Sequence, residues 1–147
     1  MYCSVDDLNK LLPAEALLQL CDDEGGGLLD SSEVQGRLQE AIDQADREID
    51  AYLSACRSVP LSPVPPLVAN ISGVLAVCGL YRRRTHAELP EGWARERERC
   101  LKLLERIAEG RLRLGVEEDG TAAEPEPPGV EVSAPARIFG DNTWSRF

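Results

Sequence analysis

The run DDEGGGLLDSSE at positions 22–33 carries the residue types best suited to chemistry in this chain. Laid against the calcium loop of an EF-hand, it places acidic residues at four of the ligand positions: Asp22, Glu24, Asp30 and Glu33. Gly27 falls where that loop needs a glycine, but Gly26 occupies a fifth ligand position and supplies no side-chain oxygen. Calcium takes about six to eight oxygen ligands, so we expect weak binding or none.

The same stretch also fits an acidic, glycine-rich turn before a helix. In that interpretation Asp30 or Ser31 caps the helix and Glu33 completes a capping box. We favour the turn, and we keep a calcium-responsive helical regulatory module with a degenerate EF-hand-like loop as the alternative function. A calcium titration followed by helicity or melting temperature separates the two.

Signatures of catalysis or of a bound cofactor are missing from the sequence. It contains one histidine, His86, in a turn-like segment, and it has no GxSxG, Walker or HExxH motif. The five cysteines are far apart and never in CxxC spacing, which argues against a zinc site or a disulfide framework. Cys56, Cys78 and Cys100 fall among apolar positions of expected helices, where a free cysteine acts as a small hydrophobe. We therefore expect no enzyme, no metal and no cofactor.

The stretch VPPLVANISGVLAVCGLYRRR, residues 64–84, is the one segment that is apolar on nearly every face of a helix. Its prolines suit a first turn and its arginines suit a C-terminal end. The proline-free apolar run rises only about 22 Å, short of a hydrocarbon core of about 30 Å, so we expect a buried central helix and no membrane span. Gly73 and Gly79 each cost about 1 kcal/mol of helix propensity, which a close approach of neighbouring backbone would explain.

Apolar residues at helical spacing predict four further helices. The first begins at Val5 after a Ser4 cap, and the second spans residues 14–20. The third is a long amphipathic helix over residues 32–56, and the fourth spans residues 93–108 before a Gly110 cap. Three surface pairs are expected on the last two: Glu33 with Arg37, Asp43 with Arg47, and Glu98 with Lys102. The predicted fold is all-α, a small helical bundle around one central apolar helix with an extended C-terminal tail.

The chain divides by composition into three parts. Residues 1–115 form the helical domain, and residues 116–136 read as a flexible acidic, proline-rich linker that cannot build a core. Residues 137–147 restore apolar anchors beside an arginine, which predicts a docking segment for a partner: Arg137, Ile138, Phe139, Trp144 and Phe147.

Charge is distributed unevenly along a chain whose net charge is −10. Residues 1–60 hold 13 acids and 4 bases, residues 61–115 hold 6 and 10, and residues 116–147 hold 7 and 2. This division suits a molecule whose acidic part meets the basic part of a neighbour, although solvated helix faces would give the same counts. A DNA-binding interpretation of residues 93–113 is disfavoured, because its arginines alternate with glutamates.

Several segments together resemble a Mu-like phage family of small proteins that are placed with head-to-tail connectors, also called adaptors. The resemblance covers roughly residues 1–115 and is carried by MYCSVDDLNKLLP, DDEGGGLLD, IDAYLSAC, PLSPVPPLVANISGVLAVCGLYRRR and EGRLRLG. Gly26 departs from the family's fuller acidic loop, whereas Arg137 and Phe139 match an Arg-x-Phe near its C-terminus.

The resemblance implies a structural protein of the virion, made in the bacterial host cytoplasm and located at the head-to-tail junction. It implies a homo-oligomeric ring of twelve copies beneath the portal protein, in contact with tail or stopper proteins. DNA would pass through the ring without sequence-specific binding.

Overall fold

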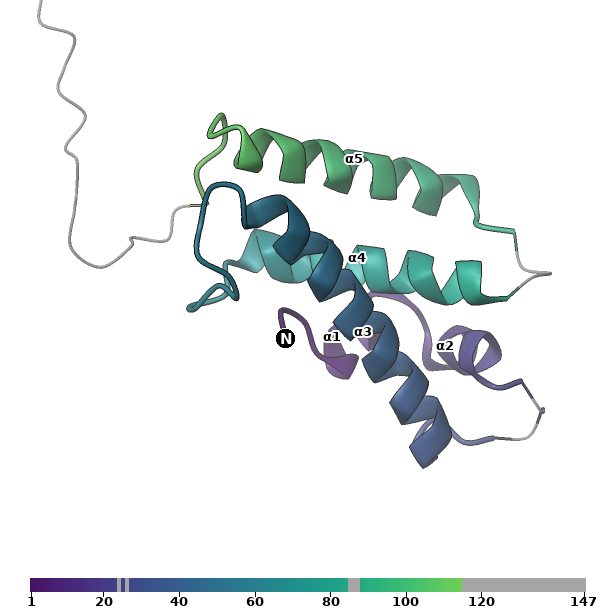
Figure 1. The fold of residues 1–147 in the computed structure, drawn as a ribbon. Coiled ribbons are helices and arrows are strands. Elements are labelled where there is room, and N and C mark those ends of the chain that lie inside the picture. Colours follow the sequence, from purple (N-terminus) through teal and green to yellow (C-terminus); the bar gives the residue numbers. More distant parts are fainter. Residues whose placement is uncertain (24, 26, 85–87, 115–147) are drawn as a thin grey trace, which may run out of the picture. The chain divides into compact units, whose positions relative to one another are not determined.

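A computed structural model describes residues 1–23, 25, 27–84 and 88–114 of the chain. Within these residues there are five α-helices and no strand, so the all-α prediction is confirmed (Figure 1). The helices are α1 (Val5–Leu11), α2 (Ala14–Cys21), α3 (Ser32–Leu53), α4 (Pro66–Arg83) and α5 (Glu91–Ala108). The chain divides into the units Met1–Val116 and Glu117–Phe147, and all five helices belong to the first. The predicted linker and docking segment lie outside the described residues.

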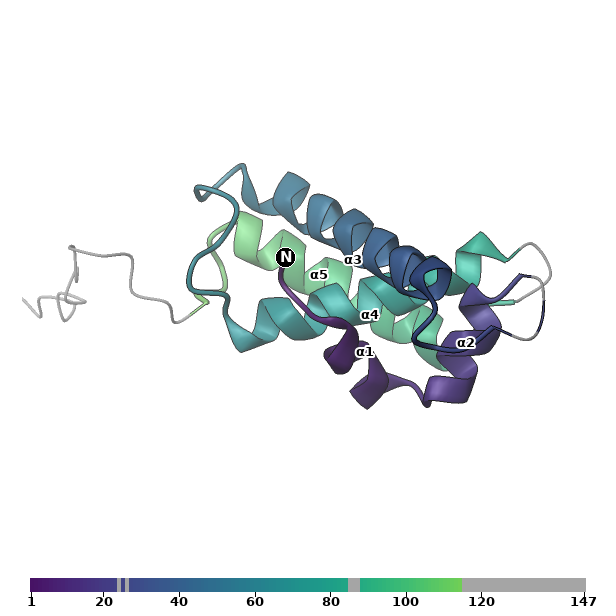
Figure 2. The ribbon, with the colours of Figure 1, turned by 90° about the horizontal axis from the view of Figure 1, so that it is seen from below.

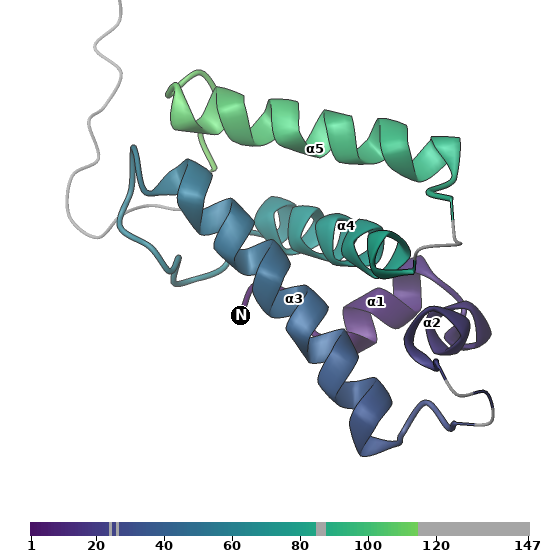
Figure 3. The same ribbon diagram turned by 45° about the vertical axis from the view of Figure 1, so that its right-hand side comes forward.

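Helix α4 is the centre of the helical unit, as its apolar sequence predicts. It packs against each of the other four helices. Helix α3 crosses it on one side, α5 runs antiparallel to it on another, and α1 and α2 lie against the remaining side (Figures 1, 2 and 3). Every residue from Ile71 to Cys78 is buried, including Ser72 and Gly73. No helix of the described residues is both long and apolar enough to span a bilayer.

The helix ends follow from local sequence. The Ser4 hydroxyl accepts a hydrogen bond from the Asp7 amide, and the Asp7 carboxylate accepts one from the Ser4 amide at 3.0 Å, which makes a capping box. Helices α2 and α4 begin directly after Pro13 and Pro65, and Gly110 follows α5 with a φ of +72°. The predicted caps at Ser4 and Gly110 are thus confirmed.

Three local predictions for α3 need correction. The helix ends at Leu53, so Cys56 is an exposed residue beyond it and not a buried helical position. Ser31 caps the helix by accepting from the Val34 amide, and Glu33 is then one residue too early to complete a capping box.

The two expected ion pairs on α3 are also replaced by other contacts. Arg37 turns away from Glu33 to Asp23 and to the Cys21 carbonyl, and Asp43 accepts from Gln39 at 2.9 Å. The expected pair of Glu98 with Lys102 forms, at 2.7 Å.

The two glycines of α4 have different surroundings. A Cβ at Gly73 would lie 2.8 Å from Leu11 Cδ1, so the approach there comes from a side chain of α1 and not from backbone. A Cβ at Gly79 would meet nothing within 4 Å. The explanation by close backbone approach is therefore wrong for both positions in the isolated chain.

We expect Gly79→Ala to stabilise the protein by up to about 1 kcal/mol, because alanine fits the helix better and the space is open. Gly73→Ala must displace the Leu11 methyl group and should give less stabilisation or a loss. Chemical denaturation of the two variants tests this, and equal changes in the free energy of unfolding would contradict it.

Val74 is 2% exposed at the middle of α4, so Val74→Asp should unfold the domain. An unpaired carboxylate in such surroundings costs several kcal/mol against a total stability of about 5 to 15 kcal/mol. Val64→Asp is a matched control, since Val64 is 37% exposed just before the same helix. Circular dichroism melting should show a folded control, and a wild-type melt for Val74→Asp would refute the central position of α4.

Candidate functional site

The acidic loop after α2 is held by its first aspartate. Asp22 Oδ1 accepts from the Gly25 amide at 3.0 Å, and Oδ2 accepts from the Gly27 amide at 2.8 Å. Gly25 has a φ of +75°, a conformation that suits glycine. Both oxygens of the first candidate calcium ligand are therefore engaged in shaping the turn.

Three arginines surround the next aspartate, Asp23. Arg83 binds it in a two-pronged arrangement, with both N–O distances 2.8 Å, while Arg37 lies 3.3 Å and Arg84 3.6 Å from its carboxylate. The hydrogen bonds from Arg83 hold the pKa of the Asp23 carboxyl below its usual range. Asp23 thus ties the loop to the end of α4 and to the first turns of α3.

The same arginines also satisfy the carbonyl end of α2. Arg83 donates to the carbonyls of Leu20, at 2.9 Å, and Cys21, and Arg84 donates to the carbonyl of Asp22. Cations at this end also oppose the negative pole of the α2 dipole. The arginines at the C-terminal end of α4 therefore stabilise a neighbouring helix as well as their own.

The remaining members of the predicted calcium loop do not form a site in the part of the chain that the structure describes. Among those residues, no group of three or more histidines, cysteines or carboxylates is placed to hold a metal ion. Asp30 is exposed next to the capping residue Ser31, and Glu33 is exposed on the first turn of α3. Glu24 and Gly26 lie outside the described residues. The expectation of weak calcium binding or none therefore stays a prediction.

A second polar cluster is buried between the N-terminal segment, α3 and α4. Asp46 is 8% exposed, and its two oxygens accept from the Tyr2 amide at 2.7 Å and from the Ser72 hydroxyl at 2.6 Å. The Met1 amino group lies 3.5 Å from Asp46 Oδ2. A buried carboxylate is stable only when it is hydrogen-bonded or paired, and here it has both kinds of partner.

The Tyr2 side chain extends this cluster to the connector before α4. Its hydroxyl donates to Asp50 and accepts from the Leu61 amide, with a 3.0 Å N–O distance for the latter. Burial and the hydrogen bond to Asp50 raise the pKa of Tyr2 to about 12. The cluster therefore fixes the first residues of the chain against two distant segments.

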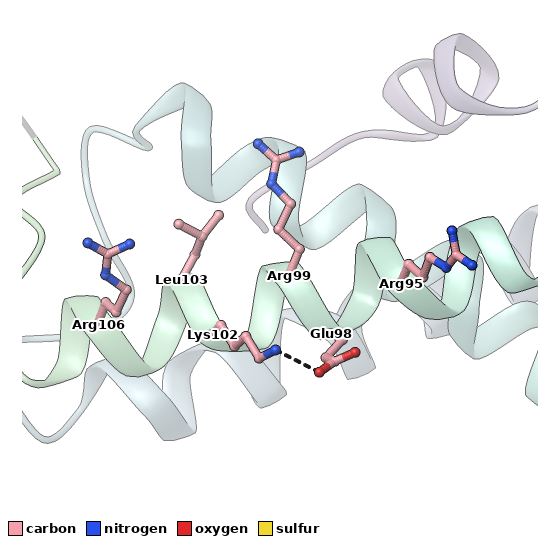
Figure 4. Close-up of a pocket in the computed structure, with 6 residues that line it drawn as sticks. All are labelled: Arg95, Glu98, Arg99, Lys102, Leu103 and Arg106. Atoms are coloured by element: carbon pink, nitrogen blue, oxygen red, sulfur yellow. Dashed lines mark hydrogen bonds and ion pairs between the residues drawn. The ribbon is translucent and has the colours of Figure 1, made fainter.

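Helix α5 presents a row of cations to solvent. An open hollow of about 540 Å³ lies along it, lined by Arg95, Glu98, Arg99, Lys102, Leu103 and Arg106 (Figure 4). Arg99, Leu103 and Arg106 point to the same side of the helix in this view. The hollow gathers four cations and one carboxylate, a grouping that the alternation of charges in the linear sequence conceals.

The predicted docking residues of the tail lie outside the described residues: Arg137, Ile138, Phe139, Trp144 and Phe147. Docking by the tail stays a prediction. The structure instead shows three clusters that sequence reasoning missed, around Asp23, Asp46 and α5. Helical spacing could have revealed the α5 row, because its members recur every three or four residues; the other two clusters join residues far apart in the chain.

Comparison with known proteins places this helical chain among the proteins of Mu-like phages. Residues 2–132 match the model of a family described as Bacteriophage Mu, Gp36, and the chain belongs to that family. It is 26% identical over 113 residues to the Mu-like prophage FluMu protein gp36 of Haemophilus influenzae, and the match covers 77% of each chain. The expected membership of a Mu-like phage family is confirmed.

The raised pKa of Tyr2 predicts a dependence of stability on alkaline pH. A phenol in the unfolded chain titrates near pH 10 and this one near 12, so its contribution is complete below about pH 10 and is lost as pH rises through about 12. Tyr2→Phe should flatten that decline and lower stability at neutral pH by about 1 kcal/mol, through the lost hydrogen bonds. Denaturant unfolding across this pH range provides the measurement; identical alkaline slopes in both proteins would contradict it.

Proposed function

We propose that this protein is a structural connector of a Mu-like phage virion, which joins the DNA-filled head to the tail. The observation that carries the proposal is membership of the Bacteriophage Mu, Gp36 family over residues 2–132. The resemblance of residues 1–115 to small phage proteins that are placed with head-to-tail connectors gives the proposal its particular role.

The proposed assembly is a ring of twelve copies at the head-to-tail junction. A ring that closes through one repeated contact needs two different complementary faces on each copy. The helical unit carries acidic side chains along the outer part of α3 and a cationic row along α5, which supports such a contact. DNA passes through the centre of the ring and is not read by sequence.

The proposed partners are the portal protein on one side and tail or stopper proteins on the other. Attachment to the portal uses residues 137–147, reached through the acidic, proline-rich segment 116–136. Apolar anchors at Ile138, Phe139 and Trp144 and the charge of Arg137 make the contact. A tethered segment of this type binds its partner and orders on binding, at a cost of about 2 to 5 kcal/mol.

Deleting residues 130–147 should abolish attachment to portal-bearing heads while leaving helicity and melting temperature nearly unchanged. The reason is that the deleted residues contribute contacts to the partner and none that the helical core needs. Co-sedimentation of the purified protein with heads gives the attachment, and circular dichroism gives the stability.

A matched control replaces Ser133 and Ala134 with each other and keeps the full length of the tail. It should attach as the wild type does. A truncated protein that melts several degrees lower would show that the tail packs on its own helices, and one that still joins heads would exclude docking by the tail.

A further inference from the structure

The cationic row of α5 is a surface built at regular spacing. Arg95, Arg99, Lys102 and Arg106 recur at steps of four, three and four residues, so they share one face of the helix and span about 16 Å. Arg95, Arg99 and Lys102 each pair with a glutamate on the same helix. The Arg95 side chain, for example, is 76% exposed and that of its partner Glu91 is 79% exposed. Exposed pairs of this kind are weak and exchange readily for another partner.

The first half of α3 presents an acidic row of matching length. Glu33, Glu40 and Asp43 are exposed at steps of seven and three residues and span about 15 Å of one face. Within the described part of the chain, none of the three has an arginine or lysine at ion-pair distance. Asp43 accepts only from the neutral amide of Gln39 among the hydrogen bonds described. Among the described residues, this row therefore forms no ion pair of its own.

Gly36 lies on the same face of α3 as the acidic row, three residues after Glu33 and four before Glu40. It is exposed in the second turn of a long helix, and a Cβ added there would meet nothing within 4 Å. The fold itself therefore gives no reason for a glycine at this position, although glycine lowers helix propensity more than any residue except proline. A glycine in the middle of an exposed helical row allows another chain to approach the backbone closely.

We propose that the α5 row of one copy packs against the α3 row of the next copy. The occupant is a second copy of this chain, and the contact is head-to-tail, since two different faces meet. In this contact, Leu103 in the hollow of α5 of one copy lies against the surface left open by Gly36 on α3 of the next copy. The inference deepens the proposed ring and rests on it, because it names the two faces that the ring joins.

A second copy fits the α5 row better than DNA does. Glu91, Glu98 and Glu105 run beside the cations on the same helix and would repel phosphates. An acidic protein face instead offers carboxylates at separate points, so that each can meet an arginine or lysine. The acidic segment 116–136 is the other candidate to bind the α5 row. Removing that segment distinguishes binding by the segment from binding by a second copy.

Charge reversal of each row tests the proposal in solution. Arg99→Glu with Lys102→Glu reverses the α5 row, and Glu40→Lys with Asp43→Lys reverses the α3 row. Each double variant alone should self-associate about tenfold more weakly than the wild type at low ionic strength, as measured by sedimentation velocity. Added salt should weaken the wild-type association, because the charges are exposed. Asp6→Lys with Glu15→Lys makes the same change of charge as the α3 reversal, at positions away from both rows, and should behave as the wild type does.

Mixing the two reversed variants gives the sharpest result. In the mixture the acidic α5 row of one variant faces the basic α3 row of the other, and the unchanged rows also complement each other. Association should therefore return in the mixture and in the quadruple variant that carries all four changes. Gly36→Leu should weaken association while melting at or above the wild-type temperature.

Several outcomes overturn the proposal. A protein that stays monomeric at millimolar concentration and low salt, both with and without residues 116–147, would do so. Full association of either reversed variant would also overturn it. A wild type that gains self-association when residues 116–147 are removed supports it, whereas loss of association on that removal assigns the α5 row to the tail. If the protein retards the migration of a DNA duplex, and Arg99→Glu with Lys102→Glu abolishes this effect, the α5 row would be assigned to DNA. The connector function fails separately, through normal attachment of tails to heads without this protein.

Discussion

The rest of the helical unit depends on the hydrogen bonds that the buried carboxylate of Asp46 accepts. A charge at 8% exposure is costly unless donors surround it, and its donors come from Tyr2 before α1 and from Ser72 within α4. Apolar packing between α3 and α4 tolerates some sliding, but a hydrogen bond of 2.6 Å does not. The carboxylate therefore fixes how α3 and α4 pack against each other and where the N-terminal residues lie.

The arginines at the end of α4 place the remaining part of the unit. Arg83 and Arg84 reach the carbonyl end of α2 and the loop residue Asp23, so α2 and the acidic loop follow α4. Internal contacts thus occupy the acids at the start of the loop and the arginines at the end of α4. The exposed charges on the outer faces of α3 and α5 stay outside these contacts, where a neighbouring molecule can use them. The division of charge along the chain becomes, in the folded unit, a division between two helix faces.

The sequence was sufficient for the helices and insufficient for the clusters. Apolar spacing, Ser4, the prolines and Gly110 are local signals, and the helices they predict are present with ends that differ by a few residues. The exception is instructive: α3 stops at Leu53 although the apolar spacing continues to Cys56. The contacts of Asp46 with Tyr2 and of Asp23 with Arg83 join residues about 40 to 60 positions apart, and no periodicity encodes such pairs. Arg37 shows the same limit, because a tertiary partner replaced the helical neighbour that spacing predicted.

Electron microscopy of particles assembled without this protein tests the connector role most directly. A protein that joins head to tail is needed after the head is filled and not before, so its removal should leave DNA-filled heads and separate, complete tails in the same lysate. Supplying the wild-type chain to that lysate should restore joined particles. Normal tailed particles in its absence, or a failure to form heads at all, would contradict the role.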